Sequence, residues 1–512
     1  MGRIALSVAV LLCACTNRPI DKVPGAEFIE ERNYYALSLD TDVDILFVID
    51  NSNSMGQEQQ NLARNFPKFI DALRTTQLGP DGSGRPCNEN DTSGCKIPNV
   101  NIGVVSTDLG AGNYGLPSCE VAGGDGGKLL AKPRIAGCTP PSRPFIRYDK
   151  GETNIKSATE DPIQRVKEAF SCIAEIGTGG CGFEHTLESA RRALDPKLAL
   201  NPGFIRPEAL LAIVFITDED DCSTTKTELF DPQQSQLSDP LGPLTSFRCF
   251  EFGLQCEVND RTRTGPRAGC RPAYDWLYKV EDYISFFKGL KPEGRVIVSA
   301  ISGPTDRVEV GRSGNDPTLM PSCQTANGHA VPALRLKAVV DAFGKRGSFS
   351  TICTDDFGPA LRGVAERIIA NIHSCLGHPP LTAGGSVACS PGAVIGTDGA
   401  GRQVTCRQGC IERADCVVYQ SVPRVGGASQ SSVVPRCPAE LFRTAGTPDC
   451  GASCPCWRLV PSGRCAKDGR TGYKLEILGK GEPPKGAAAE VACQASTLPW
   501  TSPEFAALPQ CL

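Results

Sequence analysis

Histidine is scarce in this chain, and the common catalytic motifs are missing from it. Four histidines among 512 residues leave little room for a histidine-rich metal centre. The sequence has no HExxH motif, no Walker A loop and no GxSxG elbow, which are typical of zinc proteases, nucleotide-binding proteins and serine hydrolases. No nucleophile stands beside a candidate base, so we expect a protein that is not an enzyme.

The chain also lacks an excess of positive charge. Lysine and arginine total 53, aspartate and glutamate total 57, and the formal net charge is −4. Domains that bind nucleic acid usually carry a net basic surface, so no nucleic-acid partner is expected. Beyond the first residues, no apolar run reaches the ~20 residues that a helix needs to span a bilayer.

The first residues have the features of an export signal. Arg3 precedes an apolar segment at residues 4–12 that is too short to span a bilayer. A conventional secretory signal, cut after small residues, is one interpretation. Residues 12–15, Leu-Cys-Ala-Cys, also resemble the signal of bacterial lipoproteins, which implies that Cys15 carries a lipid and is the only membrane contact. Thr16 is not the aspartate that resembles an inner-membrane retention signal, so the outer membrane is favoured.

Cysteine is abundant, and its count supports export. Of 26 cysteines, Cys13 would leave with the signal and Cys15 would be lipidated, which leaves 26 − 2 = 24. An even number in an oxidising compartment permits up to twelve disulfides. Zinc is the alternative, but the close-set cysteines at 406–416 and 454–456 lack the paired CxxC spacing of a zinc ribbon.

Local spacing predicts some of the disulfides. Cys172 ends a predicted helix and Cys181 closes the short glycine-rich turn after it, so we expect these two to bond. Cys323 and Cys353 flank a helix that returns the chain to a strand, so we expect them to bond as well. Twelve cysteines lie between residues 16 and 370 and twelve lie beyond. Cys375 is therefore expected to bond to a cysteine of the C-terminal part.

Apolar runs alternate with amphipathic helices over residues 38–376. Continuous runs of this kind are typical of strands buried on both faces, as in a parallel sheet. They occupy residues 44–50, 100–106, 210–217, 295–301 and 348–352. The alternation predicts a doubly wound α/β domain, with a mostly parallel sheet flanked by helices. Its great length comes from cysteine-bearing insertions, which disulfides are expected to hold, at residues 77–98, 110–158, 222–271 and 303–330.

The remaining segments are assigned from their composition. Residues 1–14 are the predicted lipoprotein signal, and the polar residues 15–37 are predicted to be a tether. Residues 377–512 are rich in glycine, proline, serine and cysteine, and they show almost no helical periodicity. We expect them to form a small disulfide-rich domain of strands and loops.

Polar side chains follow two of the predicted strands. Asp50, Ser52 and Ser54 come after the first strand and immediately before a helix, and Asp218 follows the third. Functional groups gather beyond the carboxyl ends of strands in such sheets. The i, i+2, i+4 spacing lets the three side chains face one point, and oxygen ligands suit Mg²⁺ or Ca²⁺. The acidic residues 219–221 are interpreted as a solvated turn.

These motifs resemble those of a known family. The stretch DILFVIDNSNSM at residues 44–55 is similar to the metal-ion-dependent adhesion site of von Willebrand factor A (vWA) domains, whose pattern is DxSxS. The stretch VFITDED at residues 214–220 resembles a later motif of that family, a hydrophobic strand that ends in Thr-Asp. The resemblance is greatest to bacterial surface lipoproteins that carry this domain.

The resemblance implies a set of metal ligands. Ser52 and Ser54 would bind the cation directly through their hydroxyls, and Asp50 and Asp218 would bind directly or through water. The cation would be Mg²⁺, or else Ca²⁺ or Mn²⁺. An acidic group of the protein ligand, typically a carboxylate, would complete the octahedron.

One position departs from the family pattern. The family usually supplies a threonine from a Gly-Thr stretch before a helix, and here Cys181 stands at the expected place. Thr178 or Glu184 could reach the metal instead. Glu184 would add a negative charge, which tightens cation binding and weakens the recruitment of an anionic ligand.

Three functions are compatible with these features. The leading hypothesis is a cell-envelope lipoprotein whose vWA-like domain mediates metal-dependent adhesion to a protein or extracellular-matrix ligand. The second is a structural envelope protein in which the metal only stabilises the fold. The third is a surface enzyme that uses the vWA-like domain as a scaffold.

Overall fold

The computed structural model describes most of the chain from residue 28 onward. The described residues are 28–36, 42–75, 78–88, 90–117, 119, 121–132, 136–207, 209–291, 294–325, 328–372, 376, 380–424, 427–444, 448–467, 470–480, 487–498 and 502–510. Across these ranges, no helix has both the length and the apolar character needed to cross a bilayer.

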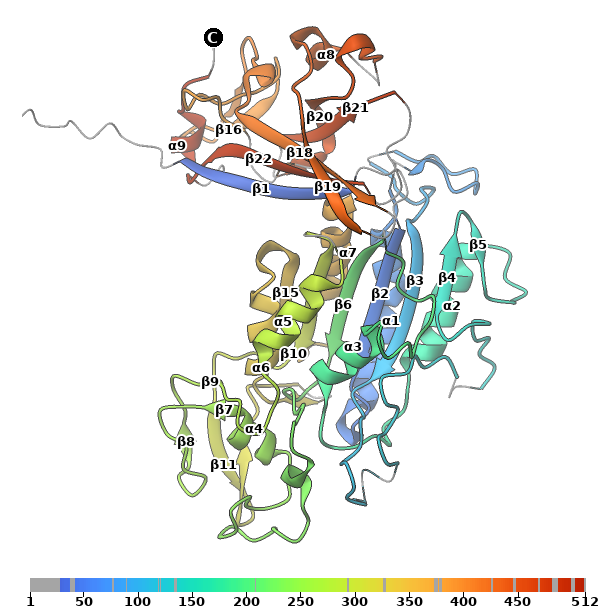
Figure 1. Ribbon diagram of the computed structural model, residues 1–512, viewed down its shortest axis with the longest axis vertical. Helices are drawn as coiled ribbons and strands as arrows, with labels where there is room; N and C mark the ends of the chain where they lie inside the picture. Colours follow the sequence, from blue (N-terminus) through green and yellow to red (C-terminus); the bar gives the residue numbers. More distant parts are fainter. Residues whose placement is uncertain are drawn as a thin grey trace, which may run out of the picture.

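A seven-stranded sheet lies at the centre of the larger part of the chain (Figure 1). Its strands are β2 (Asp42–Ile49), β3 (Asn99–Ser106), β4 (Ile146–Asp149), β5 (Glu152–Thr153), β6 (Leu210–Ile216), β10 (Val296–Ser302) and β15 (Gly347–Thr351). The order is β15-β10-β6-β2-β3-β4-β5, and the strands from β15 to β3 run parallel. At the other edge, β4 pairs antiparallel with β3, and β5 pairs antiparallel with β4. The prediction of a mixed α/β fold with a mostly parallel sheet is therefore confirmed.

Helices cover both faces of this sheet, and the alternation of side chains along β2 shows why. Ile45 and Phe47 face one layer of helices, whereas Leu46 and Val48 face the other. The first layer consists of α1 (Gly56–Ala72), α2 (Pro162–Ala174) and α7 (Gly358–Ile372). The second consists of α3 (Thr186–Leu194), α5 (Val280–Gly289) and α6 (Leu334–Asp341). Burial on both faces explains the unbroken apolar runs.

Short elements lie in the connections between the main strands and helices. They are the 3₁₀ turns η1 (Asn53–Met55), η3 (Thr227–Phe230) and η4 (Gly344–Arg346), the helix α4 (Phe247–Gly253), and the strands β7 (Leu254–Gln255), β8 (Gly265–Pro266), β9 (Arg271–Pro272), β11 (Glu309–Ser313), β12 (Asp316–Leu319), β13 (Cys323–Gln324) and β14 (His329–Ala330). Several of them, including α4, β7, β8, β9 and β11, lie together at the lower end of the molecule in Figure 1.

The C-terminal part is built mainly of strands. Its elements are β16 (Val394–Thr397), β17 (Gln403–Thr405), η5 (Ile411–Arg413), β18 (Cys416–Arg424), β19 (Gly427–Val434), α8 (Ala439–Arg443), η6 (Gly451–Ser453), β20 (Cys456–Lys467), β21 (Arg470–Leu478), β22 (Ala488–Ser496) and α9 (Pro503–Ala506). Its largest sheet also contains β1 (Phe28–Ala36), in the order β1-β22-β18-β19.

The pairing of β1 corrects the predicted tether. All nine residues of Phe28–Ala36 pair antiparallel with β22, from Phe28 opposite Ser496 to Ala36 opposite Ala488. Residues 15–37 are therefore not only a tether, because their last third is a strand of the C-terminal sheet. Local composition could not show this, because the partner strand lies at the other end of the sequence.

The C-terminal part lies at one end of the central sheet, and the elements α4, β7, β8, β9 and β11 lie at the other (Figure 1). β1 ends at Ala36 and β2 begins at Asp42, so the strands of the central sheet start close to the C-terminal part. The parallel strands run away from it, and their carboxyl ends lie towards α4 and β11. The edge on which the sequence predicts a metal site is therefore the edge far from the C-terminal part.

Disulfides hold the insertions, as predicted, but one predicted pair is wrong. The cysteines between residues 16 and 370 all bond among themselves, as Cys87–Cys95, Cys119–Cys181, Cys138–Cys172, Cys222–Cys249, Cys256–Cys270 and Cys323–Cys353. The predicted Cys323–Cys353 bond is confirmed. Cys172 and Cys181 do not bond to each other, because Cys172 lies on the buried face of α2, where Cys138 packs against the same core.

The C-terminal cysteines also form disulfides rather than a zinc site. A carboxylate oxygen of Asp449 and the sulfur atoms of Cys450 and Cys454 lie within 4.8 Å of one another, but the two sulfurs form a disulfide. Further bonds join Cys389–Cys406, Cys416–Cys493 and Cys437–Cys456. Many disulfides are typical of proteins outside the cytosol. The prediction for Cys375 concerns a residue outside the described ranges.

The bond Cys119–Cys181 closes the longest of the loops in the α/β part, with a sequence separation of 62. Replacing both cysteines by alanine is expected to lower the free energy of unfolding by about 4 kcal/mol, because the stabilisation grows with loop length. The same change at Cys87 and Cys95, whose separation is 8, is expected to cost about 2.5 kcal/mol. Urea denaturation of the two variants measures both values, and a larger loss for the short loop would contradict the expectation.

Candidate metal centre

The loop after β2 gathers one carboxylate and two hydroxyls. The backbone N–H of Asp50 donates to the carbonyl of Ile216 at 2.9 Å, so the sheet extends to this residue. The Asp50 carboxylate accepts the N–H of Ser52 at 2.7 Å, a local bond that turns the chain towards α1. The hydroxyls of Ser52 and Ser54 are then 3.1 Å apart. The predicted i, i+2, i+4 spacing therefore does place these side chains together.

The end of β6 supplies the second side of the site. Because β6 lies beside β2 and runs parallel to it, Thr217 and Asp218 leave the sheet next to Asp50. The Thr217 hydroxyl donates to the Asp50 carboxylate at 2.8 Å. The Ser54 hydroxyl lies close enough to the Asp218 carboxylate to favour its ionised form, although burial, the larger effect, raises the pKa of that carboxyl. Asp50, Ser52, Ser54 and Asp218 thus lie at one edge of the sheet, and their role as metal ligands stays a prediction.

The third loop brings Glu184 to the same place. Glu184 precedes α3 and is 1% exposed. Its carboxylate accepts a hydrogen bond from the hydroxyl of Thr107, the residue that follows β3. Thr178, the other candidate, is half-buried over the start of α1, where its methyl group would lie 3.5 Å from a Cβ at Gly56. Of the two alternatives, Glu184 is the one with a charge, and after burial the charges of Asp50 and Asp218 are among the causes that raise its pKa.

Burial and mutual repulsion make these carboxylates costly to ionise. Burial raises the pKa of Asp50, and burial followed by the charges of Asp50 and Glu219 raises the pKa of Asp218 well above its usual value. Burial and then Asp50 raise the pKa of Glu184 well above its usual value. Burial and Asp50 also raise the pKa of Glu219 to about 8. A cation among these groups would remove the repulsion.

Two carboxylate oxygens at the site have no hydrogen-bond partner within the described structure. They are Oδ1 of Asp218 and Oε1 of Glu184, and both are buried. A buried polar atom without a partner costs free energy, which a metal bond can offset. Carboxylates and hydroxyls are hard oxygen donors of the kind that Mg²⁺, Ca²⁺ and Mn²⁺ prefer. The donor set therefore fits the predicted cation.

Thr107 and Glu219 were not assigned to this site from the sequence, and Thr217 was identified only as part of the Thr-Asp motif. Thr107 and Thr217 each follow a strand and each donate to a carboxylate of the site. Glu219 lies beside Asp50 and Asp218 and shifts the pKa of the latter. Thr107 could have been found from its position after a predicted strand, which is the same signal that identified Asp50.

The acidic run after Asp218 is not the solvated turn that was expected. Asp221 is fully buried and pairs with the guanidinium of Arg335 at 3.2 Å. Asp220 accepts the backbone N–H groups of Arg335 and Leu336 at the start of α6. These two carboxylates therefore hold the insertion against α6, and they have partners other than a metal.

Comparisons with known proteins do not identify a family. No protein-family model matches the chain, and no curated protein matches it in sequence. Among solved structures, the chain is similar to the conserved hypothetical protein BatB from Bacteroides thetaiotaomicron, at 12% identity and a TM-score of 0.23, over 64% of this chain and 97% of that one. The aerotolerance-related membrane protein from Bacteroides fragilis NCTC 9343 has 14% identity and a TM-score of 0.22, over 64% and 98%. The pilus adhesin SpaC from Lactobacillus rhamnosus GG has 10% identity and a TM-score of 0.28, over 91% and 41%. Likenesses this weak carry no argument about function.

The raised carboxyl pKa values predict how stability depends on pH. The pKa of Glu219 rises from 4.5 to about 8 on folding, so its protonated form stabilises the folded state below pH 4.5 and this stabilisation is lost as pH rises towards 8. In EDTA, the midpoint of thermal unfolding is expected to fall between pH 5 and pH 8, and Glu219→Gln is expected to reduce the fall.

The control for this pH series is Glu366→Gln, an exposed position on α7 that should follow the wild-type curve. Saturating Mg²⁺ should also flatten the wild-type curve, because a cation favours the ionised carboxylates. Identical pH profiles for the wild type and Glu219→Gln would contradict the assignment.

Proposed function

We propose that residues 38–376 form a vWA-type domain that binds one divalent cation and, through it, a carboxylate of a protein or extracellular-matrix ligand. The cation is Mg²⁺, or else Ca²⁺ or Mn²⁺. The observation that carries the proposal is the meeting of Asp50, Ser52, Ser54 and Asp218 at adjacent strand ends, next to two buried carboxylate oxygens without partners. The chain acts as a binding protein rather than an enzyme.

The proposed ligands have distinct roles. The hydroxyls of Ser52 and Ser54 bind the cation directly, and Asp50 and Asp218 bind it directly or through water. Glu184 takes the place of the threonine that the vWA pattern supplies. Ser54 is exposed, whereas Asp50 is fully buried, so the open side of the metal is the side of Ser54. A carboxylate from a partner would reach the cation there.

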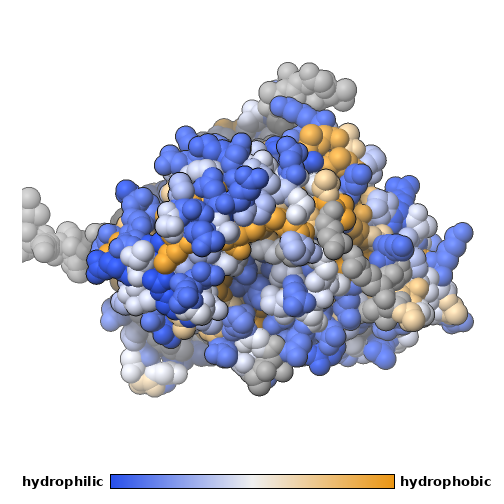
Figure 2. Space-filling model, turned by 90° about the horizontal axis from the view of Figure 1, so that it is seen from below, coloured by the Kyte–Doolittle hydropathy of each residue, from blue (hydrophilic) through white to orange (hydrophobic). Residues whose placement is uncertain are grey.

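The surface on that side suits a polar partner. Figure 2 views the molecule from below and shows the face towards which the parallel strands of the central sheet point. This face is mainly hydrophilic and is crossed by a band of apolar residues. Such a mixture is typical of interfaces that form and separate in water.

We also propose that the chain is a lipoprotein of the bacterial outer membrane, anchored through Cys15. Support comes from the position of β1, because the chain enters the fold at the C-terminal part, far from the candidate metal centre. An anchor on Cys15 would therefore hold the C-terminal part near the membrane. The metal edge would point outward, where a ligand can reach it.

A structural role for the metal is the second candidate, and Glu184 is the observation that favours it. With Asp50 and Asp218, Glu184 places three carboxylates around the cation. A divalent cation would then be neutralised by the protein itself, and it would attract an anionic ligand less strongly. In that case the metal would stabilise the fold without recruiting a partner.

Asp50→Ala is expected to abolish Mg²⁺ binding and leave the fold intact, because Asp50 is the carboxylate around which the loop is built. Isothermal titration calorimetry measures the binding, and circular dichroism checks the fold. Asp341→Ala, an exposed position on α6, serves as the control and should bind like the wild type. Unchanged Mg²⁺ affinity in Asp50→Ala would remove the site from consideration.

A second measurement separates adhesion from a structural role. Wild-type protein is passed over immobilised polyglutamate in Mg²⁺ and in EDTA, and surface plasmon resonance records the bound amount. Adhesion predicts Mg²⁺-dependent binding that Asp50→Ala loses. Mg²⁺-dependent stabilisation without any binding to polyglutamate would support the structural role.

A further inference from the structure

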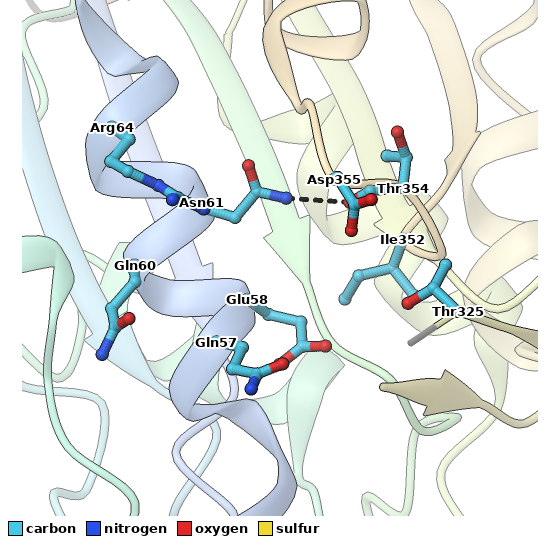
Figure 3. A pocket seen from close by; sticks show the side chains of 9 residues that line it. All are labelled: Gln57, Glu58, Gln60, Asn61, Arg64, Thr325, Ile352, Thr354 and Asp355. Atoms are coloured by element: carbon cyan, nitrogen blue, oxygen red, sulfur yellow. Dashed lines mark hydrogen bonds between the residues drawn. The ribbon is translucent and has the colours of Figure 1, made fainter. Parts of the chain in front are cut away.

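A polar groove lies along α1, the helix that follows the loop of the candidate metal centre (Figure 3). It has a volume of about 210 Å³ and runs between α1 and the loop that follows β15. Glu58, Asn61 and Arg64 line it from the helix, and Thr354 and Asp355 line it from the loop. Most of its lining side chains end in oxygen or nitrogen, so the groove suits a charged or hydrogen-bonding group.

The walls of this groove are fixed by bonds within the protein. The amide of Asn61 donates to the carbonyl of Thr354 at 2.9 Å and joins the two walls. The disulfide Cys323–Cys353 holds the loop after β15 to β13. Binding in the groove therefore needs no folding of its walls.

Glu58 is a lining residue with one carboxylate oxygen that has no hydrogen-bond partner among the residues that the structure describes. The residue is 9% exposed, and the unpaired oxygen is its Oε2. In Figure 3 the side chain points from α1 towards the opposite wall. A Cβ at Gly328 would collide with Oε1, so the carboxylate packs directly on backbone. A buried carboxylate without a partner is costly, and a cation in the groove would offset that cost.

Glu58 is also close to the metal ligands. It lies four residues after Ser54, which corresponds to about 6 Å along a helix axis. Burial and, to a smaller extent, the charge of Asp50 raise the pKa of Glu58, and the charge of Glu58 adds a small part to the raised pKa of Asp218, which burial dominates. A ligand bound at the metal would therefore pass within reach of the groove.

We propose that the groove binds the side chain of a lysine or arginine of the same ligand whose carboxylate is bound at the metal. This inference rests on the proposed function and adds the chemistry of the partner. In an extended segment, residues two apart are about 6.6 Å apart on the same side, which is close to the rise of about 6 Å along the helix from Ser54 to Glu58. The recognised segment thus holds an acidic residue and a basic residue two positions apart.

Two capped peptides test this inference on the full chain in Mg²⁺. One has the sequence Gly-Gly-Asp-Gly-Lys-Gly-Gly, and the other has norleucine in place of lysine. The wild type is expected to bind the lysine peptide about tenfold more tightly than the norleucine peptide. The lysine ammonium would donate a hydrogen bond to the buried Glu58 carboxylate, whose Oε2 is otherwise unpaired. Fluorescence anisotropy measures both affinities.

Glu58→Gln is the variant that decides the question, because it keeps the shape of the side chain and removes its charge. It should bind both peptides equally, at the wild-type affinity for the norleucine peptide. Glu366→Gln, on the exposed face of α7, should keep the tenfold preference. The inference would be overturned if the preference for the lysine peptide persisted in Glu58→Gln or were absent from the wild type. In either case, Mg²⁺-dependent binding of both peptides would still support the proposed function.

A metal-free probe separates failure of the groove from failure of the metal site. Saturation-transfer NMR with methylguanidinium in EDTA should give a signal for the wild type that Glu58→Gln loses. Loss of Mg²⁺-dependent peptide binding alone would count against the proposed function. Equal methylguanidinium signals in the two proteins would show that the groove does not bind a basic side chain. The same conclusion would follow if calorimetry found a second Mg²⁺ per chain that Glu58→Gln loses.

Discussion

The position of β2 between two parallel neighbours determines where the candidate metal centre lies. Ile49, the last residue of β2, stands opposite Ser106 of β3 and Ile216 of β6. The three strands therefore end at one level, and the residues that follow them meet. A shift of one residue in either pairing would turn the strand's buried side chains to the opposite layer of helices. The same packing that fixes the core thus fixes the distances among Thr107, Asp50 and Thr217.

The buried carboxylates at the two ends of β2 have opposite surroundings, cationic at the start of the strand and acidic at its end. Near its start, Asp44 is fully buried, and Nε of Arg206 lies 2.8 Å and Nζ of Lys291 lies 3.3 Å from its oxygens. At its end, Asp50 stands near Glu184 and Asp218, and burial followed by the charge of Asp50 raises the pKa of both of these carboxyls. Under the proposed function, a divalent cation would do at the second place what Arg206 and Lys291 do at the first. The protein would then build one charged cluster from its own residues and leave the other to a metal.

The sequence was informative wherever a signal was local. Buried strands leave unbroken apolar runs, and Asp50 follows such a run directly, so the sheet and the loop after β2 could be predicted. Signals that depend on distant residues were lost. Nothing near Asp221 indicates that Arg335 buries it, and nothing near Cys172 indicates that Cys138 lies across from it. The same applies to Glu184, which the sequence could only offer beside Thr178, because the turn that places it depends on tertiary contacts.

The pairing of β1 with β22 has a consequence for how the molecule is assembled. The whole α/β part is inserted in sequence between the first strand of the C-terminal sheet and the others. Synthesis and export both proceed from the N-terminus, so β1 emerges early. It cannot pair with β22 until the chain has emerged as far as Ser496. The strands between Asp42 and Thr351 can meet one another in the meantime. The nested domain is thereby free to fold first, and the outer sheet closes last, joining the beginning of the chain to its end.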